Sequence, residues 1–310
     1  MRKGIWYAVT AYALFGFFPV YWKLLDRVPA LQTVSHRIFW SFVVLFMFVI
    51  VTGRWSSLRT AIRSPRAVAV YSAAGLALAS NWCVYIWAVN AGFVVEAALG
   101  YFIYPLVSVV LGVVLLGERI RRVQWVAVGL AAVGVIYLAI LYRSTPWIAL
   151  FLASSFGIYG LLKKTAPLDA LYGFTIETSA LALPALAFLT FENHAGRGAF
   201  GHAGPLLTLV MIGAGPVTTV PLLLFAAAVR RLPLSLLGML QYINPSIQFL
   251  LGVFLYREPF TRGQFVGFAC VWAALLLFAG EGYVAISSSA DHAHNSGGSD
   301  GPQENRGSTH

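Results

Sequence analysis

The chain has 310 residues, of which 59% are hydrophobic and only 10% are charged. Soluble domains carry about 25% charged residues, so this composition excludes an ordinary soluble protein and indicates a membrane protein. The formal net charge of +10 at pH 7 is compatible with a nucleic-acid partner. The basic residues lie mainly at the ends of apolar stretches, however, so we expect the bilayer and no nucleic acid as the partner.

Ten apolar stretches approach the length of a membrane span, which needs about 20 apolar residues in a helix. Apolar residues are continuous in these stretches and do not alternate with polar ones as in a membrane barrel. The sequence therefore predicts an all-α polytopic membrane protein. The predicted spans cover residues 5–24, 33–52, 67–89, 94–116, 123–142, 146–162, 170–191, 205–229, 234–256 and 264–280.

Basic residues are divided unequally between the two sides of the predicted membrane. Of the 21 Lys and Arg residues, 14 fall on the side of the N-terminus and 7 on the other side. Cytoplasmic loops are enriched in Lys and Arg, and an even number of spans returns the chain to its starting side. We therefore expect a multi-pass protein with both termini in the cytoplasm.

The chain contains an internal repeat. Residues 100–129 and 240–269 align without a gap at an offset of 140 residues, with ten identical positions. An odd number of spans in each copy makes the two copies enter the membrane from opposite sides, and such inverted repeats are typical of transporters with a substrate site between the halves. We expect two five-helix repeats, residues 1–143 and 144–283.

Polar residues form a stripe that occurs in both copies of the repeat. Tyr101, Tyr104 and Ser108 share one face of the fourth span. Mid-span polar groups are costly against lipid, so both stripes predict a protein-lined cavity, with hydrogen bonding between helices as the alternative. The repeat partners in the ninth span are Gln241, Asn244 and Gln248.

The third span adds a polar and aromatic pair to this predicted cavity. Asn81 and Tyr85 lie four residues apart, on one helix face, and Trp82 and Trp87 are close in sequence. Aromatic walls with a few polar groups suit a flat or amphipathic organic molecule. We therefore expect Asn81 and Tyr85 to contact the substrate together with the two stripes.

Few ionisable residues lie inside the spans. Glu177 is the most deeply placed carboxylate, while His36 and Arg37 lie near the outer end of the second span. Carboxylates and histidines within spans often relay protons, so Glu177, His36 and Arg37 are candidates for coupling transport to protons. A structural ion pair of Glu177 with a Lys or Arg is the alternative.

The chain offers little for catalysis or for a cofactor. It lacks a GxSxG, an HExxH, a P-loop and a clustered set of metal ligands. Cys83 and Cys270 have no CxxC partner and are interpreted as core residues. We expect no enzyme activity, no metal and no cofactor. From Ser287 the chain has no large apolar residue, so residues 284–310 are predicted to be a disordered cytoplasmic tail.

Several runs of sequence closely resemble one transporter family. They are PVYWKLL (19–25), SHRIFWS (35–41), NWCVYIWAVN (81–90), residues 95–125, SFGIYGLLKK (155–164) and residues 216–245. These runs are similar to the RarD family, in the EamA branch of the drug/metabolite transporter superfamily. The resemblance implies ten helices, a plasma-membrane location and movement of small organic molecules; the family name is tied to chloramphenicol resistance or sensitivity. Tyr104 stands where Asn is usual, and Arg257 replaces a Gly.

The sequence thus predicts a secondary transporter in the plasma (inner) membrane, an exporter of small organic metabolites or drugs by alternating access. Two alternatives stay open. An uncoupled facilitator differs only in lacking an ion gradient as its driving force. A receptor or scaffold without flux is of a different class, and the internal duplication favours transport over it. Substrate, direction, coupling ion and oligomeric state are not fixed by the sequence.

Overall fold

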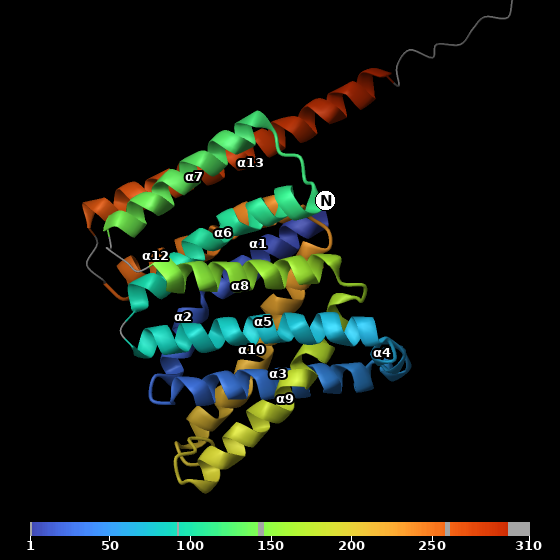
Figure 1. Ribbon diagram of the computed structural model, residues 1–310, viewed down its shortest axis with the longest axis vertical. Helices are drawn as coiled ribbons and strands as arrows, with labels where there is room; N and C mark the ends of the chain where they lie inside the picture. Colours follow the sequence, from blue (N-terminus) through green and yellow to red (C-terminus); the bar gives the residue numbers. More distant parts are fainter. Residues whose placement is uncertain (1, 92, 142–145, 258–260, 297–310) are drawn as a thin grey trace, which may run out of the picture.

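The structure is a computed structural model, and it describes residues 2–91, 93–141, 146–257 and 261–296. Helices make up the described elements (Figure 1). In chain order they are α1 (Arg2–Gly16), α2 (Phe18–Trp22), the 3-10 turn η1 (Lys23–Leu25), α3 (Ala30–Val51), α4 (Trp55–Ile62), α5 (Pro65–Asn90), α6 (Val94–Leu116), α7 (Arg122–Leu141), α8 (Pro146–Thr165), α9 (Ala170–His194), α10 (Pro205–Val229), α11 (Leu234–Leu240), α12 (Ile243–Leu250), the π-helical turn η2 (Leu251–Leu255) and α13 (Arg262–Ser296).

The predicted class, an all-α polytopic membrane protein, is confirmed. Within the described residues, nine helical segments are long and apolar enough to cross a membrane. The 20-residue helix α8 packs against α5 and α6 in the same bundle and gives the tenth segment of the prediction (Figure 1). Large apolar side chains such as Val114 and Leu183 are exposed on the outside of the bundle, as lipid contact requires.

Two of the predicted spans are broken, each near a proline. The first span divides into α1, α2 and η1 around Pro19, and the ninth divides into α11, α12 and η2 around Pro245. Proline has no N–H to donate to the carbonyl four residues earlier. In the ninth span the carbonyl of Gln241 instead accepts the N–H of Asn244 at 2.9 Å. The helix therefore tightens locally, and the Gln241 carbonyl that Pro245 cannot bond is satisfied by Asn244.

Helix packing follows the 140-residue offset of the sequence. The contact of α1 with α10 has its counterpart in the contact of α8 with α5, and α3 packs on α10 as α9 packs on α5. Three pairs of repeat counterparts contact each other directly: α6 with α11, and, as Figure 1 shows, α3 with α9 and α7 with α13. The two copies therefore interleave, and surfaces between them run through the centre of the bundle.

The α6–α11 contact is close and polar. A side chain at Gly238 would meet the carbonyl oxygen of Pro105 at 2.7 Å, so only glycine fits there. Glu118, which follows α6, accepts the backbone N–H groups of Leu234 at 2.5 Å and Ser235 at 2.9 Å. N–H groups at the start of a helix have no partner within the helix, and a carboxylate is favourable there. The Glu118 carboxylate therefore caps α11 in the other half of the chain. Its repeat counterpart Glu258 lies outside the described residues.

The chain takes the same unusual backbone conformation after α6 and after η2. Gly117 has φ of 65°, and Arg257, its partner at the 140-residue offset, has φ of 54°. Residues with a side chain pay a steric cost in this left-handed region, whereas glycine does not. The conformation gives a physical reason for the Gly that the resemblance led us to expect at position 257.

Substitutions at Gly117 and Arg257 are expected to change the stability of the protein in opposite directions. Arg257→Gly removes a steric cost and should stabilise the protein by up to about 1 kcal/mol, while Gly117→Ala should destabilise it by about 1 kcal/mol. Thermal unfolding of both variants in one detergent measures the two shifts. Equal shifts in the same direction would contradict the interpretation.

The C-terminal segment differs from expectation in part. Residues 284–296 were predicted to be disordered, but α13 continues to Ser296 and extends beyond the bundle (Figure 1). Extending a helix that has already formed does not require the costly nucleation step. Alanines such as Ala290 and Ala293 also favour helix. The remainder of the predicted tail, residues 297–310, lies outside the described residues.

Candidate functional site

A cavity of about 410 Å³ lies between the two copies of the repeat. The first copy contributes wall residues from α1 to α3, α5 and α6, and the second contributes them from α8, α10, the junction of α11 and α12, and α12. The cavity extends to the connection between η1 and α3, where Asp26 is exposed. Its volume falls within the range of about 300–1,000 Å³ that is common for small-molecule sites.

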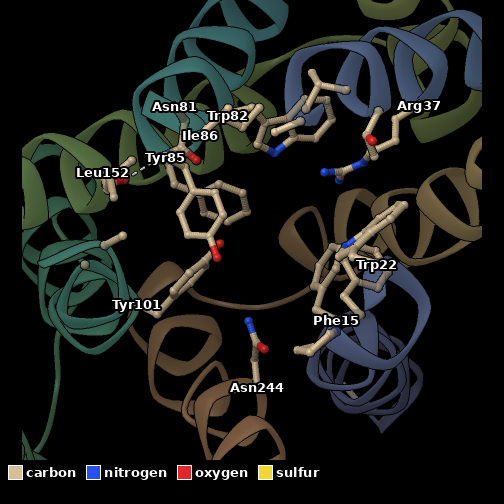
Figure 2. A pocket seen from close by; sticks show the side chains of 18 of the residues that line it. Phe15, Trp22, Arg37, Asn81, Trp82, Tyr85, Ile86, Tyr101, Leu152 and Asn244 are labelled. Atoms are coloured by element: carbon tan, nitrogen blue, oxygen red, sulfur yellow. Dashed lines mark hydrogen bonds between the residues drawn. The ribbon is translucent and has the colours of Figure 1, made fainter. Parts of the chain in front are cut away.

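The structure brings together, in one cavity wall, all of the side chains predicted to surround a cavity except Ser108. Tyr85 and Tyr101 come from α5 and α6, and their rings meet edge to face at 5.8 Å (Figure 2). Asn244 comes from α12 and points into the same cavity (Figure 2). The full set in the wall is Asn81, Tyr85, Tyr101, Tyr104, Gln241, Asn244 and Gln248.

The amide groups of the ninth span form one polar side of the wall. Gln248 Nε2 donates to Asn244 Oδ1 at 2.9 Å, so these two side chains hold each other in place. Gln241 is buried at the junction of α11 and α12, and its Oε1 finds no hydrogen-bond partner within the described part of the chain. An unsatisfied buried acceptor is costly, so Gln241 is available to a ligand donor.

Asn81 of the third span and Ser108 of the first stripe make packing contacts: Asn81 does so while lining the cavity, and Ser108 does so without lining it. Asn81 Nδ2 donates to the Leu152 carbonyl at 2.8 Å and to Ser155 Oγ at 2.9 Å, which ties α5 to α8 (Figure 2). Ser108 is fully buried and does not line the cavity. The Asn81 amide therefore forms the hydrogen bonds between helices that were given as the alternative to a cavity. Asn81 also lines the cavity.

Aromatic residues of the first span form a wall that the sequence interpretation missed. Phe15, Phe18 and Trp22 stack edge to face in series, with ring centroids 5.2 and 5.3 Å apart. Because 15% of the chain is aromatic, their identity alone gives no signal. The spacing at i, i+3 and i+7, on one helix face, is the pattern that would have found them.

The end of the cavity away from Asp26 is closed by packed rings. Tyr104 meets Phe156 at 4.8 Å, and Phe225 lies 5.7 Å from Phe156 and 5.9 Å from Tyr159. Tyr104, Tyr159 and Phe225 are almost completely buried. The cavity is therefore accessible at one end and blocked at the other by side chains from both copies of the repeat.

Arg37 belongs to the same cavity. Its guanidinium lies between the rings of Trp22 and Trp82, 4.4 and 4.3 Å from their centroids, and points into the cavity (Figure 2). Arg37 Nε donates to Thr218 Oγ1 at 3.1 Å. The four ion pairs among the described residues do not include Arg37. The wall therefore carries a positive charge with no carboxylate of the described chain paired to it.

Glu177 lies outside this cavity in a buried ion pair. Its Oε1 is 2.5 Å from Lys163 Nζ, and the two side chains are 1% and 3% exposed. Tyr159 donates its hydroxyl to Glu177 Oε2 at 3.3 Å. Glu177 and Arg37 both border a small void of about 10 Å³ without forming an ion pair. The pair with Lys163 favours the structural alternative given for Glu177.

His36 faces away from its neighbour Arg37, into a second cavity of about 200 Å³. The imidazole stacks on Phe200 at 5.2 Å, and neither ring nitrogen has a hydrogen-bond partner among the residues that the structure describes. Gln32 anchors the loop that carries Phe200, since its Nε2 donates to the Arg197 carbonyl at 2.8 Å and its Oε1 accepts the Ala199 N–H at 3.0 Å. The three candidates for coupling therefore do not form one cluster.

Known proteins match the chain closely. The sequence profile of the EamA-like transporter family matches residues 2–140. The uncharacterized transporter YojE of Bacillus subtilis is 46% identical over 89% of this chain and 93% of its own length. Protein RarD of Escherichia coli is 43% identical over 89% of this chain and 94% of its own. The chloramphenicol-sensitive protein RarD of Pseudomonas aeruginosa is 34% identical over 89% of this chain and 93% of its own.

A solved structure described as "Crystal structure of protein" has the same fold. Its TM-score is 0.68 at 19% identity, over 89% of this chain and 97% of that one. The fold and the relatives together define a polytopic membrane transporter and not an enzyme. The chain belongs to the RarD family of EamA-like transporters, within the drug/metabolite transporter superfamily.

Proposed function

We propose that this protein is a secondary transporter of the plasma (inner) membrane that exports small organic molecules through the central cavity. The single observation that carries the proposal is the cavity of about 410 Å³ between the two repeat copies, with polar side chains from both in its wall. Transporters built from inverted repeats bind their substrates at such an interface. Both termini lie in the cytoplasm in this proposal.

The closure of the cavity at one end supports alternating access as the mechanism. Residues 1–143 and 144–283 act as the two moving units, and the ring cluster of Tyr104, Phe156 and Phe225 separates when the opposite end closes. Proton coupling through Glu177, with His36 and Arg37, is one candidate for the driving force of this transport. The Glu177–Lys163 pair supports uncoupled facilitated movement as a second candidate, because it assigns the carboxylate a structural partner.

Flux into proteoliposomes tests the function. Purified protein is reconstituted, and uptake of amino acids, metabolites and chloramphenicol is measured with and without a pH gradient. We expect saturable flux of at least one compound that empty liposomes lack. Flux that a pH gradient drives uphill supports proton coupling, and flux that only equilibrates supports the facilitator. Binding without flux would support a receptor or scaffold and contradict the proposal.

A further inference from the structure

We propose that the central cavity selects organic anions, with the Arg37 guanidinium holding a carboxylate and the aromatic wall holding an apolar, flat remainder. This inference rests on the proposed function, because it names the substrate class of the same site. Among the described residues that form the wall, Arg37 and Asp26 are the two with charged side chains.

The positive charge of Arg37 is not balanced within the described protein. Asp26 is exposed at the open end and forms no ion pair with Arg37. Glu177 is already paired with Lys163 at 2.5 Å. An uncompensated cation in an apolar membrane environment is costly, so the site gains when a ligand supplies the missing anion.

The contacts of the Arg37 guanidinium within the described protein use only part of its hydrogen-bonding capacity. The faces of Trp22 and Trp82 at 4.4 and 4.3 Å contribute cation–π attraction. Thr218 accepts only the Nε–H, and no other acceptor bonds the guanidinium among the described residues. The rings hold the planar group in one orientation, and its remaining N–H groups form a fork that matches a carboxylate bidentately.

The rest of the wall fits the remainder of such a molecule. Phe15, Phe18 and Leu78 surround the guanidinium side with apolar surface, and Tyr85 and Tyr101 stand opposite it (Figure 2). Gln241 also lines the wall, and its Oε1, which has no hydrogen-bond partner among the described residues, can accept a donor of the ligand. The combination suits a small aromatic or branched carboxylate better than a cation, which Arg37 repels, or a neutral solute, which leaves the charge unpaired.

A matched set of probes tests the selectivity. Phenylacetate, phenylacetamide and phenethylamine share one ring and differ in charge. Binding to the full-length protein in detergent is followed by tryptophan fluorescence and by the melting temperature. We expect phenylacetate to bind about tenfold more tightly than the amide, because its hydrogen bonds to Arg37 are charge-assisted. Phenethylamine should bind most weakly.

Variants of Arg37 assign the preference to this residue. Arg37→Gln should remove the preference for phenylacetate over phenylacetamide, while Arg37→Lys should keep part of it because the charge remains. The probe series on the unaltered protein tests the selectivity even if a variant folds poorly. Equal binding of the three probes, no binding of the anion, or an unchanged preference in Arg37→Gln would overturn the inference. Anion binding with no flux in liposomes would instead contradict the transport proposal alone.

Discussion

Glu177→Gln is expected to destabilise the protein by about 3–5 kcal/mol, because it leaves the Lys163 ammonium buried without its partner. The change keeps the size of the side chain and an oxygen for the Tyr159 hydroxyl, which lies 3.3 Å from Oε2. Loss of packing therefore contributes little. The melting temperature and the yield of folded protein in detergent measure the effect.

The double variant Glu177→Gln with Lys163→Met is the matched control. Removing both charges of a buried pair is often neutral or stabilising, so the double variant should recover most of the loss. Lys163→Met alone should be damaging as well. A stable Glu177→Gln variant that loses pH-driven flux but keeps substrate exchange would contradict the structural role and support coupling through this carboxylate.

Gly215→Ala is expected to destabilise the bundle by about 1–3 kcal/mol through overpacking between α10 and α3. An added Cβ would lie 2.5 Å from the carbonyl carbon of Trp40, and backbone atoms cannot move aside as a flexible side chain can. The same contact holds the hydrogen bond from Ser41 Oγ to the Gly215 carbonyl at 3.2 Å. Close approach of helices at small residues is a usual source of association in membranes.

Gly129→Ala supplies the comparison for this prediction. Gly129 lies in α7, is exposed, and has open space where a Cβ would stand. Alanine favours helix over glycine by about 1 kcal/mol at either position, so the difference between the two variants isolates the packing cost. Thermal unfolding of both should show Gly129→Ala unchanged or more stable. A similar effect of the two substitutions would show that the α3–α10 contact is looser than the structure indicates.

The sequence predicted the parts of the fold and site that depend on periodic patterns. Apolar runs of span length located the helices, and the i, i+3, i+7 stripe placed Tyr101 and Tyr104 on the cavity side of α6. Helical periodicity gives a face but no partner. Lys163 is in the last turn of α8, one residue beyond the predicted span 146–162, and it reaches Glu177 because α8 and α9 both pack on α5.

Adjacent ionisable residues show the same limit. His36 and Arg37 are neighbours on α3 and were grouped as coupling residues, but successive residues of a helix point about 100° apart. The structure therefore sends Arg37 to the central cavity and His36 to a different cavity beneath Phe200. The helices that pack on α3 decide which of its faces borders the central cavity, and a single sequence does not contain that information.

Cysteine accessibility tests the central claim, that one cavity is exposed in turn to the two sides of the membrane. In a protein whose Cys83 and Cys270 are replaced by serine, Asn244→Cys introduces one thiol in the cavity wall. A membrane-impermeant thiol reagent is applied to spheroplasts, which expose the outer face of the membrane, and separately to inside-out vesicles. Ala74→Cys, in the fully buried core, is the control that should stay unlabelled from both sides. The account predicts labelling of Asn244→Cys from either side, and labelling from one side only, under every condition, would contradict it.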